Sequence, residues 1–245
     1  MKRIFLLAFG LAITLGAAAA GTDIPVYVSK AVADPARPQT DRDLDALRLP
    51  AETIAFAGVR PGMIVGELFP GSGYFTRLLT DVVGAKGKIY ATENAKWVDA
   101  AVHKALAAEP GRGNLTLKSA PFGEFDFPEK IDVLWITQNY HDLHIAKYGS
   151  VDIAAFNRHV FDALKPGGIY FILDHQANPG TTSDKIATLH RIEKAQIIRE
   201  VTAAGFTLAG ESDVLHRSAD DHAKSIFDAS VKGHTDQYLL KFQKP

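Results

Sequence analysis

Cysteine is absent from this chain of 245 residues. Its absence excludes disulfide bonds and the attachment of a lipid to cysteine, so stability has to come from a buried hydrophobic core. Hydrophobic residues make up 47% of the sequence, which contains neither an internal repeat nor a low-complexity tract. Length and composition therefore favour one domain built around one core.

An excess of charge of either sign is also lacking. The chain has 27 lysines and arginines against 28 aspartates and glutamates, and the basic residues form no run. Because nucleic acids attract proteins through clustered positive charge, we expect no nucleic-acid partner. We expect a small-molecule substrate, and the sequence leaves the oligomeric state open.

Long apolar runs are missing except at the N-terminus. Lys2 and Arg3 precede an apolar run over 4–15, and small residues occupy 16–20. This run is shorter than the roughly 20 residues that cross a membrane, and the pattern is typical of a secretory signal peptide. We predict a signal peptide over 1–20, cleaved after Ala20. The mature protein would then be exported, to the periplasm in a Gram-negative bacterium, with no stable membrane insertion.

The remaining residues divide into an arm and a domain. Residues 21–48 are rich in proline, aspartate and small side chains, which predicts an irregular N-terminal arm ending in a short helix over 41–48. Residues 49–245 form the predicted domain, which begins with another short helix over 51–57. These helices could cover an edge of a sheet or roof a ligand cleft, and we favour the edge.

A glycine-containing loop organises the predicted domain. Residues 64–68 indicate a strand, and apolar side chains from Phe75 to Val83 follow at helical spacing. Between these elements lie Gly71 and Gly73, which lack a Cβ atom and allow the backbone to turn sharply and to approach a ligand. The helix N-terminus beyond them offers free N–H groups, so the segment predicts a nucleotide-binding turn.

Glu93 supports this interpretation. It ends a predicted strand over 88–93 and follows Gly73 by 20 residues. A carboxylate in this place can accept hydrogen bonds from both hydroxyl groups of a ribose, so Glu93 is a candidate ligand-binding residue.

The rest of the domain alternates helices with strands, as expected for an α/β fold. The almost continuously apolar residues 131–137 indicate a strand that is covered on both faces. We predict helices over 97–108, 153–164 and 185–204, and further strands over 115–118, 169–173, 206–214 and 237–242.

Two of these segments resemble a known family. Glu67, Gly71 and Gly73 resemble the first motif of class I S-adenosylmethionine-dependent methyltransferases, acidic-x-Gly-x-Gly-x-Gly, with Phe69 in place of the usual first glycine. Leu-Lys-Pro-Gly-Gly at 164–168, before a strand, is similar to the second half of that family's sheet. Stretches over 49–63, 67–77 and 219–228 are also similar to a group of exported bacterial proteins called predicted methyltransferases.

The resemblance implies a three-layer αβα Rossmann-like methyltransferase fold. Its seven-stranded sheet would be mostly parallel, with an antiparallel last strand inserted between the preceding two. The resemblance also implies S-adenosylmethionine as the methyl donor. The cofactor-binding residues would be Glu67, Phe69, Gly71, Ser72, Gly73, Tyr74, Glu93, Asn94, Ala120 and Asn139.

Histidines after the fourth and fifth predicted strands are candidates for acid–base chemistry. We predict His141, His144 and His175 as catalytic residues, because histidine accepts or donates a proton near neutral pH. Metal binding by the segment 141–144 stays open as an alternative, but our prediction includes no metal. Four further polar residues are expected near the same cleft: Asp142, His190, Asp221 and His222. Residues 218–222 could form a lid or a solvated loop.

The resemblance implies an exported methyltransferase that acts on a small-molecule or envelope-associated acceptor. S-adenosylmethionine is made in the cytoplasm, however, so an exported enzyme requires a supply of donor outside it. Two alternatives therefore stay open. The methyltransferase fold could be reused for cofactor-independent chemistry, or the chain could bind a nucleoside-like ligand without catalysis.

Overall fold

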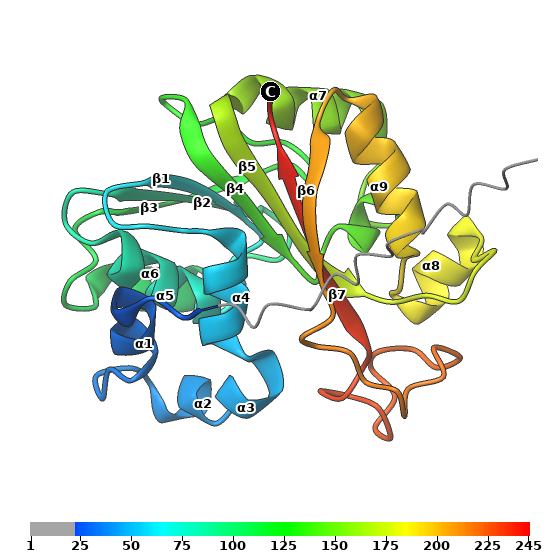
Figure 1. Ribbon diagram of the computed structural model, residues 1–245, viewed down its shortest axis with the longest axis horizontal. Coiled ribbons are helices and arrows are strands. Elements are labelled where there is room, and N and C mark those ends of the chain that lie inside the picture. Colours follow the sequence, from blue (N-terminus) through cyan, green and yellow to red (C-terminus); the bar gives the residue numbers. More distant parts are fainter. Residues whose placement is uncertain (1–22) are drawn as a thin grey trace, which may run out of the picture.

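A seven-stranded sheet forms the centre of the computed structural model, which describes residues 23–245 (Figure 1). The predicted signal peptide over 1–20 lies outside these residues. Within the described part, the strand order is β3-β2-β1-β4-β5-β7-β6. The strands are β1 (Ile64–Leu68), β2 (Lys88–Asn94), β3 (Leu115–Ala120), β4 (Ile131–Thr137), β5 (Leu164–His175), β6 (Thr207–Ser212) and β7 (Gln237–Gln243).

The directions of the strands match the predicted topology. Strands β1 to β5 pair in parallel, whereas β7 lies between β5 and β6 and is antiparallel to both. The structure therefore confirms the three-layer Rossmann-like methyltransferase fold with an inserted antiparallel last strand. Parallel pairing places the carboxyl ends of β1, β2, β4 and β5 at one edge, where open α/β sheets bind ligands.

Helices cover both faces of the sheet (Figure 1). One hydrophobic core contains side chains of α7, α8 and α9, and the other contains side chains of α1, α4 and α5. The helices are α1 (Val26–Val32), α2 (Gln39–Arg42), α3 (Asp45–Arg48), α4 (Pro50–Ala57), α5 (Tyr74–Val83), α6 (Ala100–Ala108), α7 (Ile153–Ala163), α8 (Ser183–Leu189) and α9 (Lys194–Ala203), with a 3-10 turn, η1, at His141–His144.

Strand β4 shows why its sequence is continuously apolar. Val133 and Trp135 face the core that includes α5, whereas Leu134 and Ile136 face the core that includes α7. All four side chains are fully buried. Successive side chains of a strand point to opposite faces, so a strand between two cores needs apolar residues at every position.

The N-terminal residues differ from the expected irregular arm. They form α1, whose Val28 is fully buried together with Ile54 of α4 and Leu78 of α5. The helix predicted over 51–57 is α4, which shares a core with one face of the sheet, so the prediction that it covers a sheet edge was wrong. The apolar sides of α1 and α4 extend the layer that α5 begins on this face.

The predicted helix over 185–204 is interrupted. It is divided into α8 and α9 by residues 190–193, and His190 has a left-handed φ of 56°. The backbone N–H of Ile192 donates to the carbonyl of His175 at 3.0 Å, and its carbonyl accepts from Ala177 at 3.1 Å. Pairing with the chain beyond β5 replaces helical hydrogen bonds here, which local sequence does not reveal.

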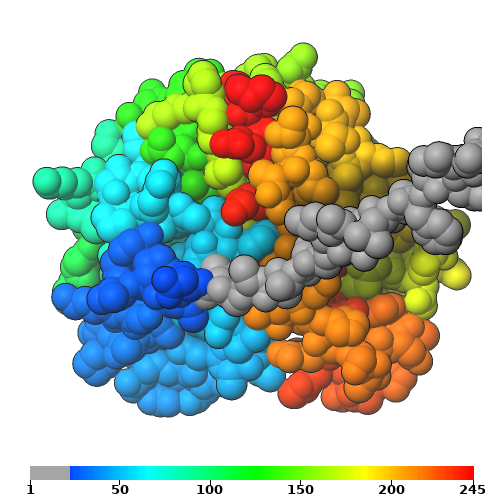
Figure 2. Space-filling model, in the orientation of Figure 1, coloured from blue at the N-terminus to red at the C-terminus, as the bar shows by residue number. Residues whose placement is uncertain are grey.

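The connection from β6 to β7, residues 213–236, lies at the carboxyl-end edge of the sheet (Figure 1). It adjoins the N-terminal helices, because the Arg217 guanidinium donates to the carbonyl of Leu47 at 3.2 Å. In the space-filling view, both segments lie at the same end of the molecule, blue and orange to red (Figure 2). No helix of the described residues is long and apolar enough to cross a membrane.

Candidate functional site

The glycine loop between β1 and α5 has the sharp geometry that its sequence predicts. Gly71 and Gly73 have left-handed φ values of 55° and 87°, and Gly73 directly precedes α5. Phe69 also adopts a left-handed φ, 59°, which is rare for a bulky residue. It therefore takes a backbone conformation that glycine adopts without strain, at the position where the family motif has a glycine.

Glu93 joins this loop to the end of β2. One of its carboxylate oxygens accepts from the backbone N–H of Gly71 at 2.9 Å, and the other accepts from Asn94 at 2.8 Å. Burial raises the pKa of Glu93, while these two hydrogen bonds act in the opposite direction. Each carboxylate oxygen has a further lone pair, so the group keeps acceptor capacity for ligand hydroxyls.

Two buried polar groups beside Glu93 have no hydrogen-bond partner among the described residues. These are one carboxylate oxygen of Glu67 and the side-chain nitrogen of Asn94. Burial raises the pKa of Glu67 to about 8, the Thr76 hydroxyl acts in the opposite direction, and the charge of Glu93 adds to the effect of burial. A buried polar group without a partner is costly, so such groups indicate a place where a ligand supplies the partner.

Aromatic rings gather around the same strand ends. Phe69, Trp97 and Phe122 lie with their ring centroids 5.1–5.6 Å apart, and Tyr148 lies 4.9 Å from Trp97. All four rings are partly buried, and we call them the aromatic cluster. Flat, partly exposed rings at this edge provide a stacking surface for a planar ligand group such as a nucleobase.

Trp97 belongs to this cluster because the predicted helix over 97–108 begins later than expected. The Asp99 carboxylate accepts from the N–H groups of Ala101 and Val102, so it caps α6 and leaves Trp97 in the preceding turn. Sequence reasoning missed Trp97 and Tyr148 as candidate ligand contacts. The Asp-x-x pattern before an alanine-rich run was the available signal for the later helix start.

Other predicted cofactor residues are divided between the ligand side and the protein interior. Ser72 is exposed in the loop, and Ala120 pairs with Asn94 at the end of β3. Tyr74 is 3% exposed and its hydroxyl lies 2.6 Å from a carboxylate oxygen of Asp45 in α3. The Tyr74 side chain thus contacts the N-terminal helices, and only its position at the start of α5 places it near the loop.

Three histidines form a second cluster at the ends of β4 and β5. The His141 ring lies 5.9 Å from the His175 ring and 5.3 Å from the His190 ring, measured between centroids. We call these residues the histidine cluster. Tyr148 lies 6.1 Å from His190, so the histidine cluster borders the aromatic cluster. The structure therefore brings together two predicted catalytic residues, His141 and His175, next to the candidate cofactor site.

Carboxylates hold His141 on two sides. Its Nδ1 lies 2.7 Å from Asp174, and its backbone N–H donates to the other oxygen of the same carboxylate at 2.8 Å. Its Nε2 lies 3.3 Å from Asp142. Burial alone would lower the pKa of His141, but the two aspartates outweigh it and raise the pKa to about 10. The His141 imidazole therefore carries a proton on both nitrogens at neutral pH in the absence of a bound cation.

The pKa of His175 is shifted in the opposite direction from that of His141. Burial lowers its pKa to about 3, so its imidazole is neutral at pH 7. Its Nδ1 lies 2.8 Å from the hydroxyl of Thr235, which comes from the connection before β7. General bases act best when their pKa lies near the working pH, and neither His141 nor His175 meets this condition.

His144 does not join the histidine cluster. Its Nε2 lies 3.2 Å from the Glu200 carboxylate of α9, and the Tyr140 hydroxyl donates to the same carboxylate oxygen at 2.9 Å. Of the three predicted catalytic histidines, His144 therefore lies apart from His141 and His175. Its contact with Glu200 places the His144 side chain on the α9 side, which strand-end position alone does not indicate.

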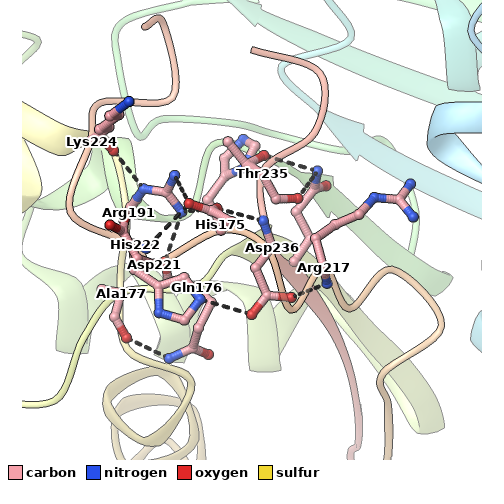
Figure 3. A network of polar contacts seen from close by, with 12 residues as sticks. His175, Gln176, Ala177, Arg191, Arg217, Asp221, His222, Lys224, Thr235 and Asp236 are labelled. Atoms are coloured by element: carbon pink, nitrogen blue, oxygen red, sulfur yellow. Dashed lines mark hydrogen bonds and ion pairs between the residues drawn. The ribbon is translucent and has the colours of Figure 1, made fainter. Parts of the chain in front are cut away.

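The connection between β6 and β7 is fastened to the same edge by a polar network (Figure 3). The buried guanidinium of Arg191 lies 2.8 Å from Asp220 and also donates to the carbonyls of Lys224 and Gln176. Asp236 accepts from the side chains of His216 and His222, at 2.9 Å each. Residues 218–222 are thus held by specific contacts rather than forming only a solvated loop.

Comparisons with known proteins agree with this architecture. No protein-family model and no curated protein match the chain. A S-adenosylmethionine-dependent methyltransferase from Aquifex aeolicus is similar with a TM-score of 0.60 and 18% identity, over 85% of this chain and 99% of that one. The cyclase SpnF is similar with a TM-score of 0.59 and 18% identity, over 87% of this chain and 85% of that one.

A glycopeptide N-methyltransferase, MtfA, solved with S-adenosylhomocysteine, is also similar. Its TM-score is 0.56 at 17% identity, and the match covers 82% of this chain and 87% of the other. These likenesses agree with the strand order and with the position of β7. The chain therefore has the fold of the class I S-adenosylmethionine-dependent methyltransferases.

Proposed function

We propose that the protein is a S-adenosylmethionine-dependent methyltransferase that acts on a small-molecule or envelope-associated acceptor. The observation that carries the proposal is the set of polar groups around Gly71. Glu93 keeps acceptor capacity, Glu67 and Asn94 have buried polar atoms without partners, and a Cβ at Gly71 would meet no atom within 4 Å. Such a site offers hydrogen bonds and open space beside a helix N-terminus.

The residues of this site fit the parts of the proposed donor. Glu93 would accept hydrogen bonds from the ribose, and the side-chain nitrogen of Asn94 would donate one. The rings of Phe69, Trp97 and Phe122 would stack against the adenine. The loop and the start of α5 would approach the charged amino-acid part. When bound, the donor would supply an electrophilic methyl group on a sulfonium.

The histidine cluster would lie on the acceptor side. Methyl transfer requires alignment of the nucleophile with the donor and exclusion of water more than it requires a strong base. We propose that the neutral His175 lines the acceptor side, whereas His141, held by Asp174 and Asp142, fixes the shape of this side. The connection over 213–236, fastened through Arg191 and Asp236, would limit access of water to this side.

The alternative functions rest on a different observation. The Gly71 N–H is already bonded to Glu93, and Phe69 brings a large ring into the loop. The loop therefore offers one free N–H fewer than the family motif suggests and has a bulky residue at the usual first glycine, which supports cofactor-independent chemistry or binding of a nucleoside-like ligand without catalysis. The likeness to SpnF, named as a cyclase, illustrates that this fold is found in proteins with other named activities.

Export is a separate part of the proposal and rests on the sequence of residues 1–20. A mature chain that begins at Gly21 in a periplasmic extract would support it. An intact Met1 on protein isolated from membranes would oppose it.

Calorimetric titration with S-adenosylmethionine and S-adenosylhomocysteine tests the donor site without knowledge of the acceptor. We expect saturable binding of both, with one site per chain. Absence of binding to the folded protein would contradict methyl transfer. Binding of adenosine but of neither sulfur compound would favour the nucleoside-binding alternative.

A further inference from the structure

We propose that His141, Asp142 and His190 form a binding site for one divalent transition-metal cation of the zinc class. Our sequence prediction included no metal, and the interruption between α8 and α9 is the feature that changes this conclusion. It places His190 against η1, so that one ligand atom from each of the three residues lies within 4.8 Å of the others.

The distances between the ligand atoms suit a tetrahedral ion. The Asp142 carboxylate oxygen Oδ1 lies 3.3 Å from Nε2 of His141 and 3.2 Å from Nδ1 of His190. Zinc binds imidazole nitrogen and carboxylate oxygen at about 2.0–2.2 Å, so neighbouring tetrahedral ligands lie about 3.3–3.5 Å apart. Two of the three separations therefore already match those around a bound ion, and the two histidine nitrogens lie within 4.8 Å of each other.

Neighbouring side chains hold two of the three ligands in the required orientation. Nδ1 of His141 lies 2.7 Å from Asp174, which leaves Nε2 directed at the proposed ion. The side-chain nitrogen of Asn139 donates to the second carboxylate oxygen of Asp142 at 2.9 Å. A carboxylate behind a ligating histidine is a usual feature of metal sites, because it fixes the ring orientation.

The backbone of His190 supports a functional role. Its φ of 56° is a left-handed conformation, which is uncommon for residues other than glycine, although histidine adopts it more often than most. Strained backbone tends to persist where the surrounding structure requires it, often at functional sites. Here the conformation ends α8 and directs the imidazole to Asp142.

The donor set decides the class of ion. Two imidazole nitrogens and one carboxylate oxygen favour zinc and similar transition metals, whereas magnesium and calcium prefer oxygen ligands only. Three protein ligands leave a fourth position for water or a substrate oxygen. The His190 ring lies 6.1 Å from Tyr148 of the aromatic cluster, so a cation held by His190 would lie near the proposed donor site. The metal site does not depend on the proposed function.

Zinc binding to the full chain, freed of metal with a chelator, tests the proposal without any methyl donor. We expect one equivalent of zinc to bind and to raise the melting temperature, because an ion that binds only the folded state stabilises it. Magnesium at the same concentration should have no comparable effect. Absence of zinc binding to the folded chain, or tighter binding of magnesium, would overturn the proposal.

Substitutions locate the site. His190→Asn keeps a residue that tolerates left-handed backbone but removes the imidazole, and Asp142→Asn removes the charge without changing size. Each of the two substitutions should abolish the binding of one zinc ion per chain. His222→Asn is the matched control, because His222 also has a left-handed φ, 61°, and lies against Asp236 outside the site. It should bind zinc like the unchanged protein.

Asp174→Asn tests the site with all three proposed ligands in place. Loss of the carboxylate behind His141 should weaken zinc binding by about 10–100-fold. This variant decides the question if His190→Asn or Asp142→Asn fails to fold. Unchanged affinity in Asp174→Asn, or binding lost only in His222→Asn, would place the ion elsewhere and overturn the proposal.

Discussion

The backbone N–H of Gly71 donates a hydrogen bond of 2.9 Å to the Glu93 carboxylate, which joins the glycine loop to the end of β2. A charged acceptor at this point would contact both the loop and a bound ribose. Hydrogen bonds to charged groups contribute about 1.5–3 kcal/mol, so Glu93 should dominate donor affinity in this site.

Glu93→Gln should weaken binding of S-adenosylhomocysteine by several-fold to about a hundredfold, because it removes the charge and one acceptor. Calorimetry measures the change. Glu129→Gln is the control, since Glu129 contacts Lys88 at the opposite end of β2. This variant should bind S-adenosylhomocysteine like the unchanged protein. Equal affinity in both folded variants would show that Glu93 does not contact the ligand.

Trp97→Ala should lower affinity for the same ligand by roughly two- to tenfold, because stacking contributes about 0.5–1.5 kcal/mol. Tryptophan fluorescence monitors ligand binding at Trp97, because the chain has two tryptophans and the other one, Trp135, is fully buried in the core. Ligand should quench the emission of Trp97 and leave that of Trp135 unchanged. Quenching that persists in Trp97→Ala would argue against adenine stacking at the aromatic cluster.

Glu67 should make the protein less stable as the pH rises. Burial raises its pKa to about 8 in the folded state, above its ordinary value near 4.5. Between these values the unfolded chain loses this proton while the folded chain keeps it. The protonated Glu67 therefore stabilises the folded state fully below about pH 4.5, and this stabilisation is lost as the pH rises towards 8.

Urea unfolding at about pH 5 and pH 8 measures this effect, which should be on the order of a few kcal/mol. Glu67→Gln has no proton to lose and should show a smaller decrease over the same interval. An identical decrease in the variant would assign the pH dependence to other groups.

Arg191→Met should lower the free energy of unfolding by about 3–5 kcal/mol, because it leaves the buried Asp220 carboxylate without its cation. Adding Asp220→Asn to this variant should restore part of the loss. Lys194→Met removes a more exposed ion pair with Glu211 and should cost less than about 1 kcal/mol. Urea unfolding of the three variants tests the ranking, and a neutral Arg191→Met would refute the structural importance of this pair.

The strands and the α/β class could be predicted because they follow from local pattern, whereas the inserted antiparallel last strand was implied by the resemblance to a family. The apolar run over 131–137 requires burial on two faces, and Gly71 and Gly73 mark a turn at a strand end. Glu93 was located as a strand-end carboxylate by spacing alone, and the structure places it within hydrogen-bonding distance of Gly71. The spacing of apolar residues and the residue types that form turns involve only a few neighbouring positions, so both can be identified from the sequence.

The candidate site was predictable only in part, because its geometry depends on contacts between distant segments. His141 and His175 are neighbours as expected, but His144 faces α9, where it contacts Glu200. Trp97 joins the aromatic cluster only because the Asp99 cap starts α6 three residues late. The sequence contains these residues, but it does not state the directions of their side chains.

Sequence alone determined the fold class, the glycine loop and the strand-end acid, since each depends on short-range steric and hydrophobic rules. Tertiary structure alone decided that the helix over 185–204 divides at His190. There the backbone of Ile192 pairs with the chain beyond β5, and Arg191 reaches Asp220 of the β6–β7 connection. These long-range hydrogen bonds outweigh local helix propensity, and they bring His190 to Asp142 and His141.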